Sequence, residues 1–119
     1  MRFAGYAAIF DRIDRGGDVV RRRAFASAVG KTVPVLWQHD ARRQIGAVEH
    51  LSEDEKGLRV IGNITEAESV GPGSALSFGY RVRRATLGTN RELLEVDLIE
   101  VSVVRQPMQP NARIHAVSG

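Results

Sequence analysis

Short runs of alternating apolar and polar residues, rich in β-branched side chains, recur along most of this chain and constrain its fold more than any other feature. Glycine, proline, asparagine and aspartate separate these runs, as turns separate the strands of a β domain. The pattern predicts strands near residues 3–9, 33–38, 44–51, 57–64, 76–84, 92–97, 99–105 and 112–117. Turns are expected at 14–18, 53–57 and 88–90, where residues that tolerate a positive φ or bond their own backbone gather.

Two segments are typical of helix rather than strand. Arg22–Val29 ends at Gly30, as short helices often do, and Thr65–Val70 has room for one helical turn before Gly71. We therefore expect a mainly β (α+β) fold. Its form is a small closed or partly open β-barrel of about seven or eight strands, with one or two short peripheral helices.

Length and composition indicate an ordinary globular protein. The 119 residues suit a single domain over residues 1–119, with 43% hydrophobic and 26% charged residues. The absence of cysteine excludes disulfides and thiolate metal sites. Charges or glycines interrupt every apolar stretch well short of the ~20 residues that span a membrane, and Met1–Phe10 lacks a signal-peptide pattern. We expect neither membrane association nor export.

The chain carries a formal net charge of +3, and 15 of its 17 basic residues are arginine. These arginines are scattered, for example at 21–23, 42–43 and 83–84, without interleaved aromatic residues. A nucleic-acid-binding barrel of the OB type is one alternative, but only 6% of residues are aromatic, too few for base-stacking platforms. Solvated surface charge is the preferred interpretation, and no specific nucleic-acid partner is expected.

Ser77 is the first candidate for chemistry. In the run from Leu76 to Arg83, alternation places Leu76, Phe78 and other apolar residues on one face and Ser77 and Gly79 on the other. Ser77 is thus expected to face away from the core, with Gly79 leaving space for a substrate backbone. An exposed strand serine is ordinarily a surface residue, so this position alone does not assign catalysis.

His39 is the second candidate. The apolar strand at 33–38 ends in His39 and Asp40, and a histidine at a strand end can act as a partly exposed acid or base near neutral pH. The alternatives are a turn capped by Asp40 or a histidine satisfied by its neighbours. His39, His50 and His115 have no metal-ligand spacing, so neither a metal nor a cofactor is expected.

Glu100 is the third candidate. Alternation places Ile99, Val101 and Val103 on the apolar face, and Glu100 and Ser102 on the other. A carboxylate presented in this way can orient an imidazole, the third role in a catalytic triad. The alternative is a solvated surface carboxylate.

Six pieces of the sequence, in order, resemble the phage prohead proteases, capsid-maturation enzymes similar in fold and chemistry to the herpesvirus assemblins. The resemblance extends over nearly the whole chain. The pieces are Gly5–Asp11, Asp14–Asp18 with Ala24-Phe25, Val35–Asp40 with Ile45-Gly46, Leu76–Tyr80, Leu94–Val104 and Pro107–Ala112.

The resemblance implies a herpesvirus-protease-like fold and a serine endopeptidase. Its substrate would be scaffold, or the scaffolding arm of the major capsid protein, and it would act in the host cytoplasm inside the assembling procapsid. Matched by motif, Ser77 is the nucleophile, His39 the general base and Glu100 the third member, with Ser102 left as a substrate or structural neighbour. A homo-oligomer, in particular a dimer, is the implied assembly. The sequence does not place the oxyanion hole; the candidates are backbone amides near Arg81–Arg84 or an arginine acting through water.

One segment departs from the family pattern. Family members usually carry a longer helix before the nucleophile strand, whereas this chain has only residues 66–75 there, with Gly71-Pro72-Gly73 in the middle. This departure supports an alternative function: a catalytically inactive barrel with the protease fold that binds capsid or scaffold protein.

Overall fold

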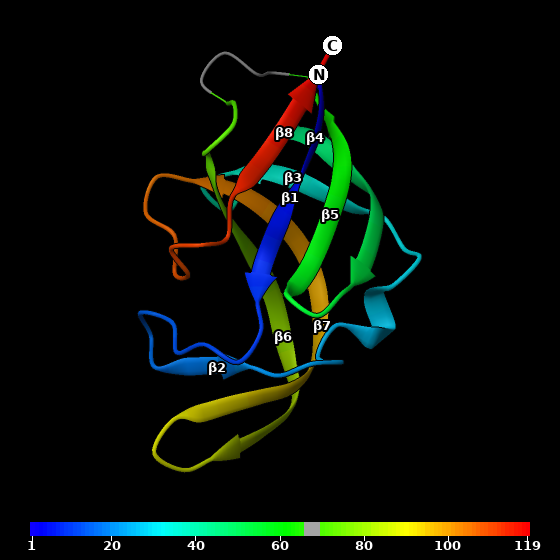
Figure 1. Cartoon of the computed structure of the whole chain (residues 1–119). Coiled ribbons are helices and arrows are strands. Elements are labelled where there is room, and N and C mark those ends of the chain that lie inside the picture. Colours follow the sequence, from blue (N-terminus) through cyan, green and yellow to red (C-terminus); the bar gives the residue numbers. More distant parts are fainter. Residues whose placement is uncertain (66–69) are drawn as a thin grey trace.

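The computed structural model describes residues 1–65 and 70–119, which form eight strands and one short 3₁₀ helix (Figure 1). The strands are β1 (Arg2–Ile9), β2 (Asp18–Val20), β3 (Val33–Trp37), β4 (Asp40–Glu53), β5 (Gly57–Ile64), β6 (Ala75–Leu87), β7 (Arg91–Val104) and β8 (Ile114–Ser118). The helix, η1, spans Ala26–Ala28. The mainly β fold predicted from the alternation is confirmed.

The strands of the described residues form one sheet in the order β2-β7-β3-β4-β5-β1-β8, and β6 pairs with β7 outside this path. Strands β2 and β3 run parallel to β7, at opposite ends of it, whereas β6 is antiparallel to β7. Over residues 101–103, β7 therefore has β3 on one side and β6 on the other. This arrangement brings the end of β3 and the start of β6 to the two sides of a single strand.

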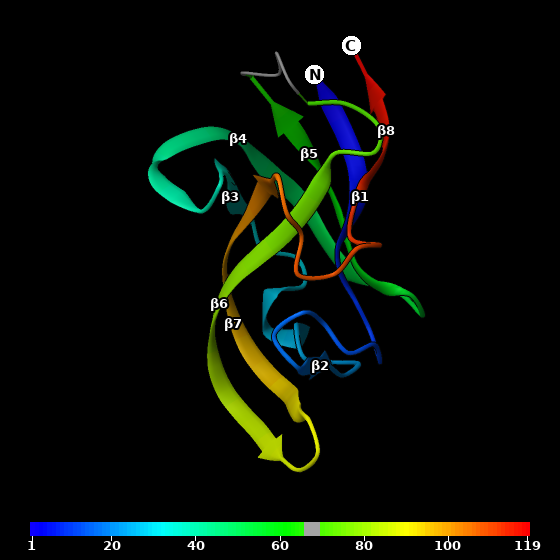
Figure 2. The same ribbon diagram turned by 90° about the vertical axis from the view of Figure 1, so that its left-hand side faces the viewer.

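The sheet curls into the partly open form of the predicted barrel. Among the described residues β6 and β8 are not paired as strands; Ala75 of β6 forms an isolated bridge with Arg113, which immediately precedes β8. Beside that bridge, the Leu76 amide donates to the carbonyl of Ala112 at 2.8 Å. At the other end, the tip of the β6–β7 hairpin extends beyond the rest of the molecule, as both views show (Figures 1 and 2).

The helix predicted over 22–29 is wrong, because the structure has only one 3₁₀ turn there, at Ala26–Ala28. Arg23 adopts a φ of 72°, in the left-handed region, which a right-handed helix does not tolerate. The amides of Arg23 and Phe25 donate instead to the Glu53 carboxylate of β4, at 2.6 and 3.0 Å. A side chain from another strand thus satisfies donors that a helix would have left for capping.

Several boundaries also differ from the prediction. The segments 92–97 and 99–105, predicted as two strands, form the single strand β7, and the short strand β2 was not predicted. The helical turn predicted over 65–70 falls largely on residues 66–69, outside the described residues. Among the described residues, no helix is both long enough and apolar enough to cross a membrane.

A β-bulge at Ile99 changes which β7 side chains face the core. Gly79 pairs with Glu100, but Tyr80 pairs with Leu98, so Ile99 is an extra residue on β7. The bulge shifts the core-facing positions of β7 by one residue. The prediction that Ile99 lies on the apolar face is therefore wrong, and Ile99 is 48% exposed.

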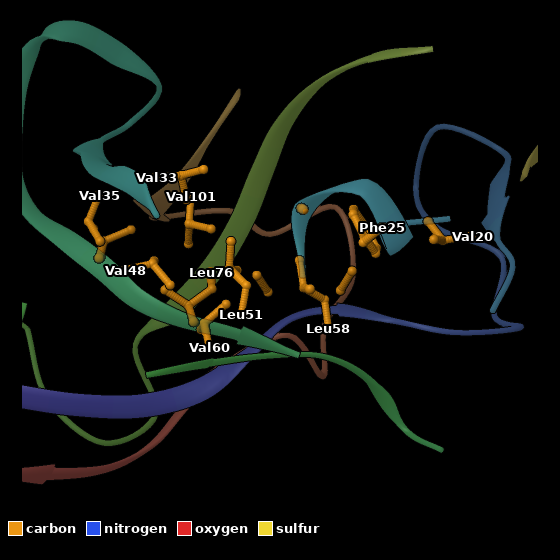
Figure 3. Close-up of a cluster of buried hydrophobic side chains, with 14 of the residues drawn as sticks. Val20, Phe25, Val33, Val35, Val48, Leu51, Leu58, Val60, Leu76 and Val101 are labelled. Carbon is orange, nitrogen blue, oxygen red and sulfur yellow. The ribbon is translucent and has the colours of Figure 1, made fainter. Parts of the chain in front are cut away.

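The core is one cluster of apolar side chains on the inner face of the curled sheet (Figure 3). Strands β3 to β7 each contribute to it, with Val35, Val48, Val60, Leu76 and Val101. Phe25, fully buried, lies toward one end of the cluster and stacks edge-on against Phe78, with 5.1 Å between ring centroids. Burying each such side chain contributes roughly 1.5–3 kcal/mol, so the core holds β6 and β7 in register.

Candidate active site

The connection between β3 and β4 is a two-residue turn formed by Gln38 and His39. Trp37 pairs with Asp40 across it, and both turn residues have positive φ, 52° for Gln38 and 60° for His39. Positive φ at both central residues is the requirement of a type I′ hairpin turn, where asparagine and glycine are usual. Non-glycine residues in this region store local strain, and such strain gathers at functional sites.

Hydrogen bonds to the end of β7 hold this turn in place. The Gln38 amide donates to the carbonyl of Val103 at 2.9 Å, and the Gln38 side-chain oxygen accepts from the amide of Arg105 at 2.9 Å. The His39 amide donates to Ser102 Oγ at 3.1 Å. His39 is therefore placed over β7 although it follows β3 in the chain.

The imidazole of His39 contacts the carboxylate of Glu100. His39 Nδ1 lies 2.5 Å from Glu100 Oε1, and the side chain of Glu100 is 8% exposed against 42% for that of His39. The hydrogen bond that His39 donates to Glu100 raises the pKa of His39 above its ordinary value; burial opposes this shift, and the charge of Glu100 adds to it. Because the carboxylate engages Nδ1, the neutral imidazole carries its proton there, and Nε2 can accept another. The pair has the geometry of a general base and its orienting carboxylate.

Gly79 makes room for the Glu100 carboxylate. The two residues are direct partners across the β6–β7 ladder. A Cβ atom added to Gly79 would lie 2.2 Å from Glu100 Oε1 and 2.8 Å from Glu100 Cδ, closer than such atoms approach. The Glu100 carboxylate thus fills the space beside Gly79, and the prediction that this space is open to a substrate backbone is wrong.

Ser77 lies on β6, on the face that also carries Glu100 and Ser102. Ser77 and Ser102 are direct partners across the ladder, and Cβ atoms of such pairs are about 4.5–5.5 Å apart. Ser102 in turn bonds the backbone of His39, so Ser77 and His39 lie on either side of Ser102. Among the described residues no hydrogen bond joins Ser77 to His39, and catalytic hydrogen bonds often tighten only when substrate binds.

Two of the candidate residues are more buried than the alternation predicted. Ser77 is 7% exposed and Glu100 is 6% exposed, although both were expected on an open strand surface. The alternation does separate the faces correctly near Ser77, because Leu76 belongs to the core cluster and Ser77 does not. The prediction of an open surface was wrong because the His39 turn packs against Glu100 and Ser102 on the face opposite the core.

The backbone amides of Arg81–Arg84 are unsuited to the oxyanion hole. These residues continue β6, where Arg81, Val82 and Arg84 pair with β7, and all four are exposed. At about 3.3 Å per residue, Arg81 is about 13 Å along the strand from Ser77. A donor must lie about 3 Å from the oxyanion, so this sequence-based candidate is wrong.

Ser102 is the site residue to which the sequence assigned no definite role. It is 0% exposed and donates its hydroxyl proton to Glu100 Oε2. The period of two in a strand was a usable signal, because it places residues 100 and 102 on one face. In the described part of the chain, no group of three or more histidine, aspartate or glutamate side chains is arranged to hold a metal ion.

The fold is that of the herpesvirus proteases. The crystal structure of KSHV protease in complex with a hexapeptide phosphonate inhibitor matches with a TM-score of 0.67 at 11% sequence identity. The match covers 95% of this chain and 63% of that chain. The herpesvirus-protease-like fold implied by the sequence resemblance is therefore confirmed.

The chain belongs to the caudovirus prohead serine protease family, whose model matches residues 1–119. The prohead protease of Enterobacteria phage HK97 is 29% identical over 133 residues. That alignment covers 97% of this chain but 59% of the HK97 protein, so the chain spans about three fifths of its relative's length. The family predicted from six short motifs is confirmed.

Proposed function

We propose that this chain is a serine endopeptidase that cleaves scaffold, or the scaffolding arm of the major capsid protein, during capsid maturation. The observation that carries the proposal is the 2.5 Å contact between His39 Nδ1 and Glu100 Oε1, with Ser77 on the adjacent strand. Membership of the prohead serine protease family supports the same chemistry. In this proposal Ser77 is the nucleophile, His39 the general base and Glu100 the orienting carboxylate.

The reaction is acyl transfer in two stages. His39 Nε2 accepts the proton of Ser77 Oγ while Oγ bonds to the carbonyl carbon of the scissile peptide. The C–N bond then breaks, and the leaving amine takes the proton from His39. Water attacks the resulting acyl-enzyme, gives a proton to His39, and Ser77 leaves with that proton restored. Glu100 holds the ring throughout and stabilises the imidazolium that forms twice.

The proposal also places the protein in its assembly. The HK97 relative is a prohead protease, and the partner proposed for this chain is capsid protein of its own virus. We place its action inside the assembling procapsid in the host cytoplasm. A dimer is the proposed oligomer, and sedimentation equilibrium of the purified chain tests it: a monomer at all concentrations would reject it.

The test of function is labelling of the purified protein with a serine-directed phosphonate, followed by mass spectrometry. Ser77 should carry the label, Ser77→Ala and His39→Ala should abolish it, and labelling should fall in acid as His39 becomes protonated. Ser52→Ala is the matched control, because Ser52 lies exposed on β4 and should have no effect. Chelators should not reduce cleavage; loss of cleavage that zinc restores would indicate metal-dependent hydrolysis instead.

The rival function, an inactive barrel that binds scaffold, gives a different result. In an assembly assay with coat and scaffold proteins, the wild-type chain should process its substrate and Ser77→Ala should not. If Ser77→Ala and His39→Ala both leave processing intact, another protein cuts and this chain is a binding module. Wild-type protein that binds scaffold but never takes up the phosphonate would lead to the same conclusion.

A further inference from the structure

We propose that Ser102 is a positioning residue, whose hydroxyl holds both the backbone and the ring of His39 in place for proton transfer. The inference rests on the proposed peptidase function and assigns a role to a residue that touches neither substrate nor the scissile bond. It follows from a closed set of contacts that joins His39 to Glu100 and Ser102, two neighbouring residues of β7 more than 60 positions further along the chain.

The contacts form a ring. The His39 amide donates to Ser102 Oγ at 3.1 Å, and the Ser102 hydroxyl donates to Glu100 Oε2. Glu100 Oε1 accepts a hydrogen bond from His39 Nδ1 at 2.5 Å, which closes the ring of contacts. One oxygen of the carboxylate thus holds the imidazole, and the other is held by the serine that holds the backbone of the same histidine.

The hydroxyl of Ser102 is committed to this ring. A serine hydroxyl has one proton to donate, and that of Ser102 goes to Glu100. Its oxygen accepts from His39, and the residue is 0% exposed. Away from water these bonds are stronger and less mobile than at the surface. The ring therefore fixes the orientation of the carboxylate as well as its distance from the imidazole.

The turn that carries His39 requires such support. Gln38 and His39 both have positive φ, a backbone conformation that is strained for non-glycine residues and persists only where surrounding contacts hold it. Gln38 has its own anchors on Val103 and Arg105, whereas the amide of His39 is held by Ser102. Loss of the Ser102 hydroxyl should leave the turn in place through Gln38 and loosen His39 alone.

The same contacts explain why Ser77 rather than Ser102 is assigned as the nucleophile. Ser102 bonds the Nδ1 side of the His39–Glu100 pair, and its proton points to a carboxylate. Ser77 lies directly across the ladder from Ser102, one strand further from β3. Ser102 therefore lies between His39 and Ser77, and its contacts with His39 determine how the imidazole is placed relative to the Ser77 hydroxyl.

The kinetic test compares Ser102→Ala, Ser102→Thr and Ser102→Cys in a peptide-cleavage assay, with circular dichroism to confirm folding. Ser102→Ala should lower kcat by about 10- to 100-fold with KM nearly unchanged, because misplacement of about 1 Å costs this much. Threonine keeps the hydroxyl and should recover most of kcat, whereas cysteine is a poor donor and should not. Ser27→Ala is the matched control, because Ser27 bonds the β7 carbonyl of Val96 and lies outside the ring.

An activity-independent readout is the imidazole N–H resonance of His39, recorded by NMR in a Ser77→Ala background. With Ser102 present, the His39 imidazole should give a slowly exchanging Nδ1–H signal, which is identified by its loss in His39→Gln. Ser102→Ala should broaden this signal. Should Ser102→Thr fail to fold, the comparison of Ser102→Ala with Ser102→Cys and this resonance decide the matter.

Three results would overturn the inference: kcat within twofold of wild type in Ser102→Ala, equal loss in the alanine and folded threonine variants, or a change in KM alone. Failure of the peptidase proposal looks different. In that case the wild-type chain neither cleaves nor takes up phosphonate, while the His39 resonance still depends on Ser102.

Discussion

Replacement of Gly79 by alanine should separate the His39–Glu100 pair without disturbing the fold. Gly79 lies opposite Glu100 in the ladder and has no positive φ, so its backbone suits alanine. The added methyl group would lie 2.2 Å from Glu100 Oε1. An ordinary contact needs more than 3 Å, so the carboxylate must move by about 1 Å.

That movement is large compared with the contact it disturbs. His39 Nδ1 and Glu100 Oε1 are 2.5 Å apart, and a displacement of about 1 Å takes them to the limit of hydrogen bonding. Misplacement of this size typically costs about 10²-fold in rate. The buried carboxylate loses one partner at a cost of order 1–3 kcal/mol, offset in part by about 0.4–1 kcal/mol from the stiffer unfolded chain. The net loss of stability should therefore stay below about 3 kcal/mol, so the variant should still fold while its activity falls about 100-fold.

Two measurements check this prediction. The pKa of His39, followed by NMR in the Ser77→Ala background, should fall toward its ordinary value, because the hydrogen bond donated to Glu100 is the main cause of its raised pKa. The kcat for peptide cleavage should fall about 100-fold. Gly88→Ala is the matched control, since the nearest atom to its added Cβ is 3.9 Å away at the hairpin tip.

Wild-type values of both the pKa of His39 and kcat in Gly79→Ala would contradict this prediction. Glu100 would then not depend on the space beside Gly79, and the 2.5 Å contact would not be what orients His39. A loss of kcat with the pKa of His39 unchanged would equally contradict it, because the effect would not act through the pair.

Three further predictions concern the titration of His39 and the apolar core. Glu100 raises the pKa of His39, and only the neutral imidazole accepts a proton. The acid limb of the pH profile of kcat/KM should therefore lie above the ordinary histidine pKa of about 6.5. Glu100→Gln should move this limb to lower pH, and an unmoved limb would exclude the pairing of His39 with Glu100. A histidine whose pKa is higher in the folded than in the unfolded protein stabilises the fold at pH below its unfolded pKa, and this stabilisation is lost as pH rises through its folded pKa. Urea unfolding should therefore show His39→Gln more destabilised at about pH 6 than at about pH 9. Phe25→Ala, at a fully buried site, should lower the free energy of unfolding in urea by about 3–5 kcal/mol. Leu87→Ala, at a position that is 86% exposed, should change it by no more than about 0.5 kcal/mol. Similar losses for both variants would contradict the assignment of the core.

The alternation was enough to predict the strands and the two faces of most of them. Period two is a local property of the backbone, so strand 57–64 could be predicted with the bounds it has in the structure. The six motifs also identified the family and suggested His39, Ser77 and Glu100 as its site residues. The helix predicted over 22–29 failed because Glu53, on another strand, satisfies the amides that would have begun it.

Local pattern does not determine how strands meet. The bulge at Ile99 inverts the alternation of β7, because one extra residue in a ladder moves the following side chains to the other face. The sequence treated Glu100 and Ser77 as surface residues, since it could not show that the His39 turn packs over that face.

The candidate residues were therefore readable from the chain, whereas their assembly into a site was decided only by the tertiary structure. The His39–Glu100 contact joins residues 61 positions apart, and Ser102 joins His39 across 63. Such contacts depend on strand order and register, which are set by the hydrogen bonds and packing of the whole sheet. The room for Glu100 beside Gly79 exists only because that register places the two residues opposite one another.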